Sequence, residues 1–228
     1  MASARSLSLT YRSVGSPGAP GDGQARAVRS GAVVSQRADQ GDVRAKILGE
    51  AIRLFAHHGY GSTSMREVAE ASGVTKPTLY YHFGSKEGLF RAIIEGRIEA
   101  FAAMVRATVT GDDPVVERLE QFLEAYLLGA LEDIDTLRFM LTCSLPNPET
   151  PPNCRVIGRH LQNLEPLAEL IREGIEAGEL RSDLDVMGAV AALVGAANLH
   201  LATALEGAQV HRDTISTILN TWLHGAKR

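Results

Sequence analysis

Residues 64–90, SMREVAEASGVTKPTLYYHFGSKEGLF, determine the fold of this protein. The segment opens with a capping box, because the Ser64 hydroxyl can accept from the Glu67 amide while the Glu67 carboxylate reaches back. The box predicts a short helix over Met65–Ala71. Gly73 ends this helix, since glycine adopts the left-handed conformation of a sharp turn without steric cost.

A second short helix follows directly. Thr75 is its expected N-cap, and Pro77 falls in the first turn of Lys76–Phe83, where a missing N–H costs nothing. Two short helices joined by a glycine turn have the proportions of a helix-turn-helix, although a plain helical hairpin in a bundle would look similar. Ala69 is small where the helices must approach. The expected shared core consists of Phe55, Val68, Val74, Leu79, Phe83 and Leu89.

The remaining chain predicts helices only. A first helix is expected from Asp42, as N-cap, to Gly59, and Ser85 caps a long fourth helix that reaches about Thr108. Further helices are expected at Asp113–Leu131, Ile134–Leu145, Ile157–Ile175 with a kink or restart at Pro166, Leu184–Leu205 and Arg212–His224. Alternation of period two is absent from the sequence, so the fold class is all-α.

Three regions are expected along the chain. Residues 1–41 lack apolar periodicity and are rich in Gly, Ser, Ala and Pro, which predicts a disordered arm. Residues 42–90 form the three-helix domain, and the fourth helix joins it to a helical domain at 91–228. The arm is an inert tail, the product of a start codon assigned too early, or a segment whose five arginines add affinity for nucleic acid.

Charge divides unevenly over these regions. The net charge of −4 splits into +3 for residues 1–41, +1 for 42–90 and −8 for 91–228, so it does not exclude a nucleic-acid partner. Two cysteines are too few for a disulfide scaffold, which favours the cytoplasm. Val186–Leu205 is uncharged and long enough to cross a bilayer. Its Ala- and Gly-rich composition instead favours a buried bundle helix, and we expect no membrane partner.

The second short helix presents an unusual set of side chains. Nearly all its exposed residues bear hydrogen-bonding groups or positive charge, which suits base edges and phosphates of DNA. A protein-binding face would be more apolar. An enzyme, such as a helical hydrolase or transferase, is disfavoured because the sequence contains no P-loop, zincin, nucleophile elbow or paired-carboxylate motif. DNA binding is therefore the favoured function.

The motifs over residues 43–90 resemble those of the TetR family of transcriptional regulators. The matching positions are Phe55, Gly59-Tyr60, Thr63, Val68-Ala69, Gly73-Val74, Leu79-Tyr80-Tyr81-His82-Phe83 and Ser85-Lys86-Glu87-Gly88-Leu89. The resemblance implies a non-enzymatic, ligand-responsive repressor that needs no cofactor. It also implies a homodimer that binds a near-palindromic double-stranded DNA operator and an unidentified small-molecule effector.

The resemblance also implies roles for single residues. Lys76 and Thr78 would contact bases. Phosphate contacts would come from Thr63, Ser64, Thr75, Tyr80, Tyr81, His82 and Lys86. Pro77 departs from the glycine or alanine of many relatives, which puts the base contacts in doubt. Tyr81 is either a surface phosphate contact or a partly buried core residue.

The C-terminal domain is expected to bind the effector and the second subunit. The resemblance places dimerisation in the last two helices, with Gly188, Ala191, Ala192, Gly195, Leu199, Ala202, Ile215, Ile218, Leu219 and Trp222 at the interface, unless these helices are simply monomer core. Candidates for the effector pocket are Phe101, Met104, Phe122, Tyr126, Phe139, Met140, Cys143 and His160, each of which also suits ordinary core packing. Cys143 and Cys154 are a redox pair or two buried thiols, and the histidines lack metal-ligand spacing.

Overall fold

The computed structural model describes residues 24–144, 151 and 162–226, with side chains for 41–144, 151 and 162–225. Every regular element in these residues is an α-helix, as the sequence predicts. The chain divides into two units at Asp42, and each is described by itself. Helix α1 spans Gln24–Ser62. Residues 1–23 of the expected arm lie outside the described residues.

The first helix begins earlier than the sequence predicts. It starts at Gln24, so Asp42 lies inside it and is no N-cap. The prediction relied on apolar periodicity, which residues 24–41 lack, whereas their Ala, Arg and Gln content has good intrinsic helix propensity. The predicted stop is confirmed, because Gly59 has the non-helical angles φ 80° and ψ 162° within α1.

The two short helices form as the capping signals predict. Helix α2 spans Met65–Ser72, and its capping box is complete: the Ser64 amide donates to Glu67 Oε2 at 2.7 Å, and the Glu67 amide donates to Ser64 Oγ at 3.2 Å. These bonds from Ser64 hold the pKa of the Glu67 carboxyl below its usual value. Gly73 closes the helix at φ 66°.

Helix α3 spans Lys76–Phe83 and helix α4 spans Lys86–Val109. Both carry the predicted caps, since Thr75 accepts from the Thr78 amide and Ser85 from the Gly88 amide. The predicted core around them is confirmed, with Phe55, Val68, Leu79, Phe83 and Leu89 buried and Val74 half-buried. We call this first cluster the DNA-binding core, after the function that the sequence predicts for it.

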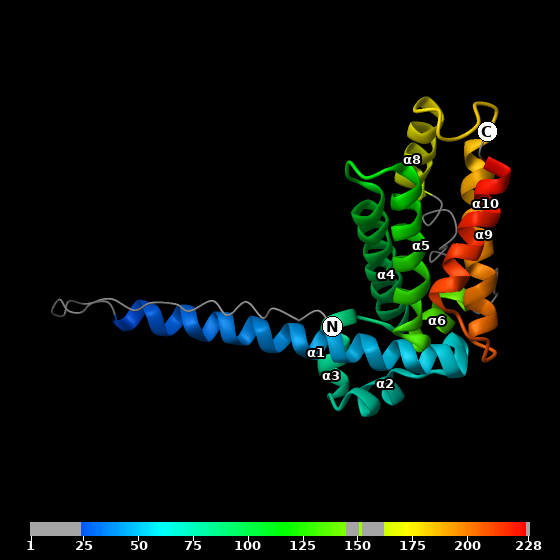
Figure 1. Cartoon of the computed structure of the whole chain (residues 1–228). Coiled ribbons are helices and arrows are strands. Elements are labelled where there is room, and N and C mark those ends of the chain that lie inside the picture. Colours follow the sequence, from blue (N-terminus) through cyan, green and yellow to red (C-terminus); the bar gives the residue numbers. More distant parts are fainter. Residues whose placement is uncertain (1–23, 145–150, 152–161, 227–228) are drawn as a thin grey trace, which may run out of the picture. The chain divides into compact units, whose positions relative to one another are not determined.

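The C-terminal helices form a second cluster, which we call the sensor core. Its helices are α5 (Val115–Leu131), α6 (Ile134–Ser144), α8 (Glu165–Glu176), α9 (Val186–Ala204) and α10 (Arg212–Ala226). Helices α4, α5, α8, α9 and α10 stand side by side in Figure 1. Pro166 lies in the first turn of α8, so the helix restarts there as predicted, and the expected turns at 157–161 lie outside the described residues.

Helix α4 belongs to both clusters. Its first half, from Leu89 to Ile98, packs into the DNA-binding core, and its end, with Val105 and Val109, packs into the sensor core. A shift of α4 along or across the bundle therefore changes the surroundings of both clusters.

Candidate nucleic-acid interface

The first turn of α3 presents the two predicted base-contacting residues. Lys76 is exposed and Thr78 is half-buried, while the next residue, Leu79, is fully buried. The Thr75 and Thr78 hydroxyl oxygens lie 2.9 Å apart, and Thr75 Oγ1 also accepts from the Thr78 amide at 3.3 Å. These hydrogen bonds fix the rotamers of both threonines. The threonines lie at the N-terminal end of α3, where unpaired backbone N–H groups give a partial positive charge.

The second half of α3 carries the aromatic candidates. Tyr80 is 48% exposed, His82 is half-buried, and Tyr81 is 79% exposed. The exposure of Tyr81 rules out the core alternative for this residue. All three remain predicted phosphate contacts.

Ser64 and Lys86 flank this surface from neighbouring helices. Ser64 is exposed at the start of α2. Lys86 has its ammonium 4.3 Å from the centroid of the Tyr60 ring, and it donates to the Gly61 carbonyl at 3.1 Å. Lys86 thus holds the C-terminal end of α1 as well as bringing a positive charge to the surface, a structural role that the sequence did not indicate.

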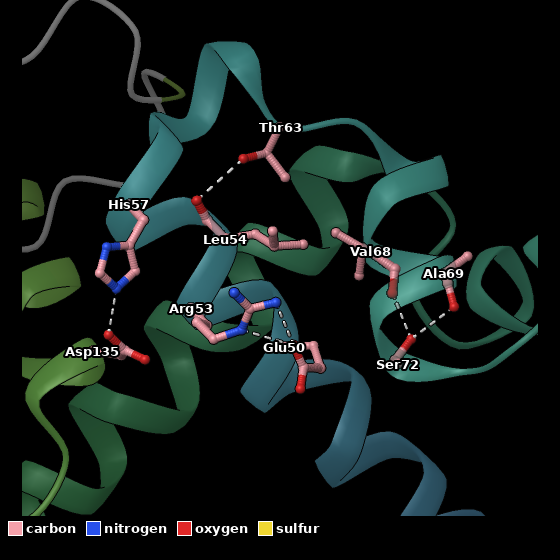
Figure 2. A network of polar contacts seen from close by, with 9 residues as sticks. All are labelled: Glu50, Arg53, Leu54, His57, Thr63, Val68, Ala69, Ser72 and Asp135. Carbon is pink, nitrogen blue, oxygen red and sulfur yellow. Dashed lines mark hydrogen bonds and ion pairs between the residues drawn. The ribbon is translucent and has the colours of Figure 1, made fainter.

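Thr63 corrects the predicted set of phosphate contacts. Its side chain is 1% exposed, and its hydroxyl donates to the Gly59 carbonyl at 2.9 Å and lies 3.4 Å from the Leu54 carbonyl. Figure 2 shows the hydroxyl turned back toward α1. Because α1 loses its regular turns at Gly59, its last carbonyls need a donor, and Thr63 supplies one. The Thr63 hydroxyl is therefore a cap for α1 and is not available to a phosphate.

Known proteins share both the motif and the fold. The family model "Bacterial regulatory proteins, tetR family" matches residues 47–93. The chain is 32% identical over 143 residues to the HTH-type transcriptional repressor ComR of Escherichia coli (strain K12), a match that covers 61% of this chain and 68% of ComR. The chain belongs to the TetR family. It is thus a DNA-binding transcriptional regulator, and α2 and α3 are its helix-turn-helix.

Two further proteins resemble this chain over more than the length of the helix-turn-helix. The HTH-type transcriptional repressor KstR2 of Mycobacterium tuberculosis is 28% identical over 144 residues, 63% of this chain and 72% of KstR2. The structure of FadR from Bacillus subtilis in complex with stearoyl-CoA matches with a TM-score of 0.68 at 20% identity, over 79% of this chain and 98% of FadR. The second match shows the fold alone.

The predicted effector-pocket residues of this TetR-family chain do not lie together. Phe101, Met104, Phe122 and Tyr126 belong to the sensor core, where the Tyr126 ring packs 5.7 Å from both phenylalanine rings. Phe139, Met140 and Cys143 instead pack against the DNA-binding core. His160, like Cys154, lies outside the described residues.

The position of α6 corrects the assignment of Phe139 to the pocket. Phe139 is 2% exposed and lies 5.3 Å from the Phe90 ring and 6.2 Å from the Phe55 ring. At the start of the same helix, Asp135 Oδ1 lies 2.7 Å from His57 Nε2 of α1 (Figure 2). The spacing of Phe139, Met140 and Cys143 marks one helix face, but nothing local in the sequence says which core that face meets.

The predicted dimer residues also divide into two sets. The α9 residues Gly188, Ala191, Ala192, Gly195, Leu199 and Ala202 are all exposed, and Leu199 is 65% exposed. By contrast, Ile215, Ile218 and Leu219 of α10 are 3–5% exposed within one subunit. Trp222 is half-buried and donates from Nε1 to the Ala189 carbonyl at 2.9 Å. Ile215, Ile218 and Leu219 therefore belong to the core of the subunit, which corrects their assignment to the interface, whereas Trp222 remains a predicted interface residue.

Two hollows lie outside the predicted sites. One, of about 610 Å³, opens between the α4–α5 turn and the acidic face of α8, and a second, of about 390 Å³, opens between α1 and α4. Among the described side chains, no three metal-ligating residues gather in one place.

Proposed function

We propose that this protein is a ligand-responsive repressor that binds a near-palindromic operator as a homodimer, with α3 of each subunit in the major groove. The observation that carries this proposal is the capped, outward-facing first turn of α3, with Lys76 exposed beside the Thr75–Thr78 pair. One short recognition helix covers only a few base pairs, so two half-sites about one helical turn apart are needed for a specific site.

Separate roles for the two threonines follow from their hydrogen bonding. Either hydroxyl can be the donor in this pair, and we assign the donor role to Thr78, which leaves the Thr75 proton for a phosphate oxygen. The lone pairs of Thr78 are then left for an amino group on a base edge. Lys76 adds a donor for guanine O6 or N7. Ser64, Tyr80, Tyr81, His82 and Lys86 would fix the register of the helix on the backbone.

The dimer interface in this proposal is the exposed face of α9. Among the described helices, α9 alone is long and apolar enough to cross a membrane by length and composition, with a mean hydropathy of 1.6 and 33% of its length buried within the subunit. An exposed apolar face of this extent marks a surface that another protein or a membrane covers. Small residues on the face allow a second copy of α9 to approach closely, and a two-fold axis makes the face self-complementary.

The proposed effector is a neutral or cationic lipophilic molecule bound in the sensor core. Phe101, Met104 and Phe122 offer apolar contacts, and the Tyr126 hydroxyl, which donates to Asn198 Oδ1 at 2.6 Å, is a polar group among them. The net charge of −8 over residues 91–228 disfavours an anion. FadR, which shares this fold, was solved with stearoyl-CoA, whose acyl chain is lipophilic but whose CoA moiety is anionic, so it supports only the lipophilic character of the effector.

Two helices would transmit the effector's presence to the DNA-binding core. Helix α4 spans both clusters, and α6 does the same, with Leu137 in the sensor core and Phe139 in the DNA-binding core. An effector that packs better against one position of these helices would change the spacing of the two recognition helices. The change that the effector causes in the free energy of operator binding cannot exceed the difference in its own binding free energy between the two helix positions. A coupling of about 1–3 kcal/mol is typical.

Reciprocity tests this proposal. An effector found by thermal-shift screening should lower operator affinity by the same factor by which operator DNA lowers effector affinity. A compound that binds the sensor core and leaves operator affinity unchanged would contradict the mechanism.

As a transcriptional regulator related to bacterial regulatory proteins, the protein would act in the cytoplasm, with no catalytic role and no cofactor.

A further inference from the structure

A lysine of α1 lies against the turn of the helix-turn-helix. The ammonium of Lys46 is 3.4 Å from the position that a Cβ on Gly73 would occupy. Gly73 is the residue that ends α2, and Thr75, two residues later, caps α3. Lys46 therefore brings a positive charge from the first helix to the point where the chain enters the recognition helix.

The end of α2 explains why the ammonium lies there. The last turn of α2 contains no basic side chain of its own, so the partial negative charge of its final carbonyls lacks a local counterpart. Glycine at position 73 leaves room for the ammonium to approach the backbone. Lys46 supplies from another helix the cation that α2 lacks.

The charge of Lys46 is not neutralised by an acid. Lys46 is exposed, and within the described side chains no carboxylate lies within 4.0 Å of its ammonium. Arg53, two turns further along the same face of α1, differs because its guanidinium pairs with Glu50 at 2.9 Å. Of these two cations, Lys46 is the one without a carboxylate partner among the described side chains.

We propose that Lys46 is a further phosphate-contacting residue of the DNA interface. This inference rests on the proposed placement of α3 in the major groove. The ammonium is at most about 5 Å from the Gly73 Cα, and two residues of chain span at most about 7.6 Å between Cα atoms, so the ammonium lies within roughly 12 Å of the Thr75 Cα. That is little more than one Debye length at 0.1 M salt, which is about 10 Å, and the flexible four-carbon stem lets the ammonium move toward an anion. A phosphate held by Thr75 would thus lie within the reach of Lys46.

The test compares Lys46→Gln with Lys46→Arg and with the control Arg53→Gln, which removes the same charge from the same face of α1. Affinity for operator and for random duplex DNA is measured by fluorescence anisotropy in the full-length protein from about 50 to 300 mM salt. Removing one lysine–phosphate pair per subunit lowers the slope of log affinity against log salt by roughly 0.9, or about 1.8 for a dimer. The melting temperature of each variant is measured beside it.

We expect Lys46→Gln to weaken binding to both DNAs by a similar factor and to lower the slope by nearly two. Lys46→Arg should restore the slope, and Arg53→Gln should leave it unchanged. A wild-type slope in Lys46→Gln overturns the inference, as does a weakening that appears only together with a lowered melting temperature. If either of these results is found while the wild-type protein still distinguishes operator from random DNA, only the role of Lys46 is rejected. If the wild-type protein binds both DNAs equally, the proposed function is rejected, and the role of Lys46 with it.

Discussion

Replacement of Phe139 by alanine probes the docking of α6 on the DNA-binding core. Truncating a buried phenylalanine costs about 3–5 kcal/mol. Phe139 is 2% exposed and packs against two aromatic rings, so the upper half of that range applies, and we expect a loss of about 4 kcal/mol. For a chain of this length, 1 kcal/mol corresponds to about 2–4 °C, which predicts a fall in melting temperature of about 8–16 °C.

The single tryptophan makes the location of this loss measurable. Trp222 lies in α10 of the sensor core, so its fluorescence follows that cluster, whereas circular dichroism follows all helices. In Phe139→Ala, urea should unfold part of the helix signal before the fluorescence changes. The matched control is Phe122→Ala, which removes an equally buried ring from the sensor core and should move the fluorescence transition first. A Phe139→Ala variant that loses less than about 1 kcal/mol, or shows coincident transitions at the wild-type midpoint, would refute the reasoning.

Four other substitutions test the recognition helix, the dimer and the half-buried Tyr126. Lys76→Ala and Thr78→Ala should each reduce discrimination by about 1–3 kcal/mol at the base pair they contact, and equal losses on operator and random DNA would remove them as base contacts. Gly195→Glu should yield monomers in analytical ultracentrifugation without a loss of helix content, because no atom lies within 4 Å of a Cβ built there, and a persisting dimer would exclude the α9 face. Tyr126→Phe should cost about 1–3 kcal/mol by removing the donor to Asn198. Because burial raises the pKa of Tyr126 to about 12 from the usual 10.0, its stabilisation is complete below pH 10 and is lost toward pH 12. The urea midpoint of the variant should fall less steeply over that window than that of the wild type.

Local signals in the sequence predicted most of the DNA-binding half. Caps and the turn depend on neighbouring residues alone, so Ser64, Thr75 and Ser85 identified the starts of three helices correctly. The start of α1 was missed because residues 24–41 have helix propensity without apolar periodicity.

Packing between distant residues could not be predicted in this way. Thr63 matches the family motif in type, but its burial depends on where α1 ends and how the chain turns back. The apolar faces of α6 and α10 are visible in the sequence, yet the partners of Phe139 and Ile215 are set by how the helices pack. Nothing in the sequence indicated a role for Lys46, because Gly73, against which its ammonium lies, belongs to a distant part of the sequence.

The central claim, that α3 recognises a specific palindromic site, is tested most directly by one binding measurement. Purified wild-type protein is titrated against a duplex of its own upstream region and against a scrambled duplex of equal length and composition, at physiological salt. We expect binding to the upstream duplex to be at least about a thousandfold tighter than binding to the scrambled duplex, with two subunits per site. Equal affinity for the two duplexes, or one subunit per site, would contradict it.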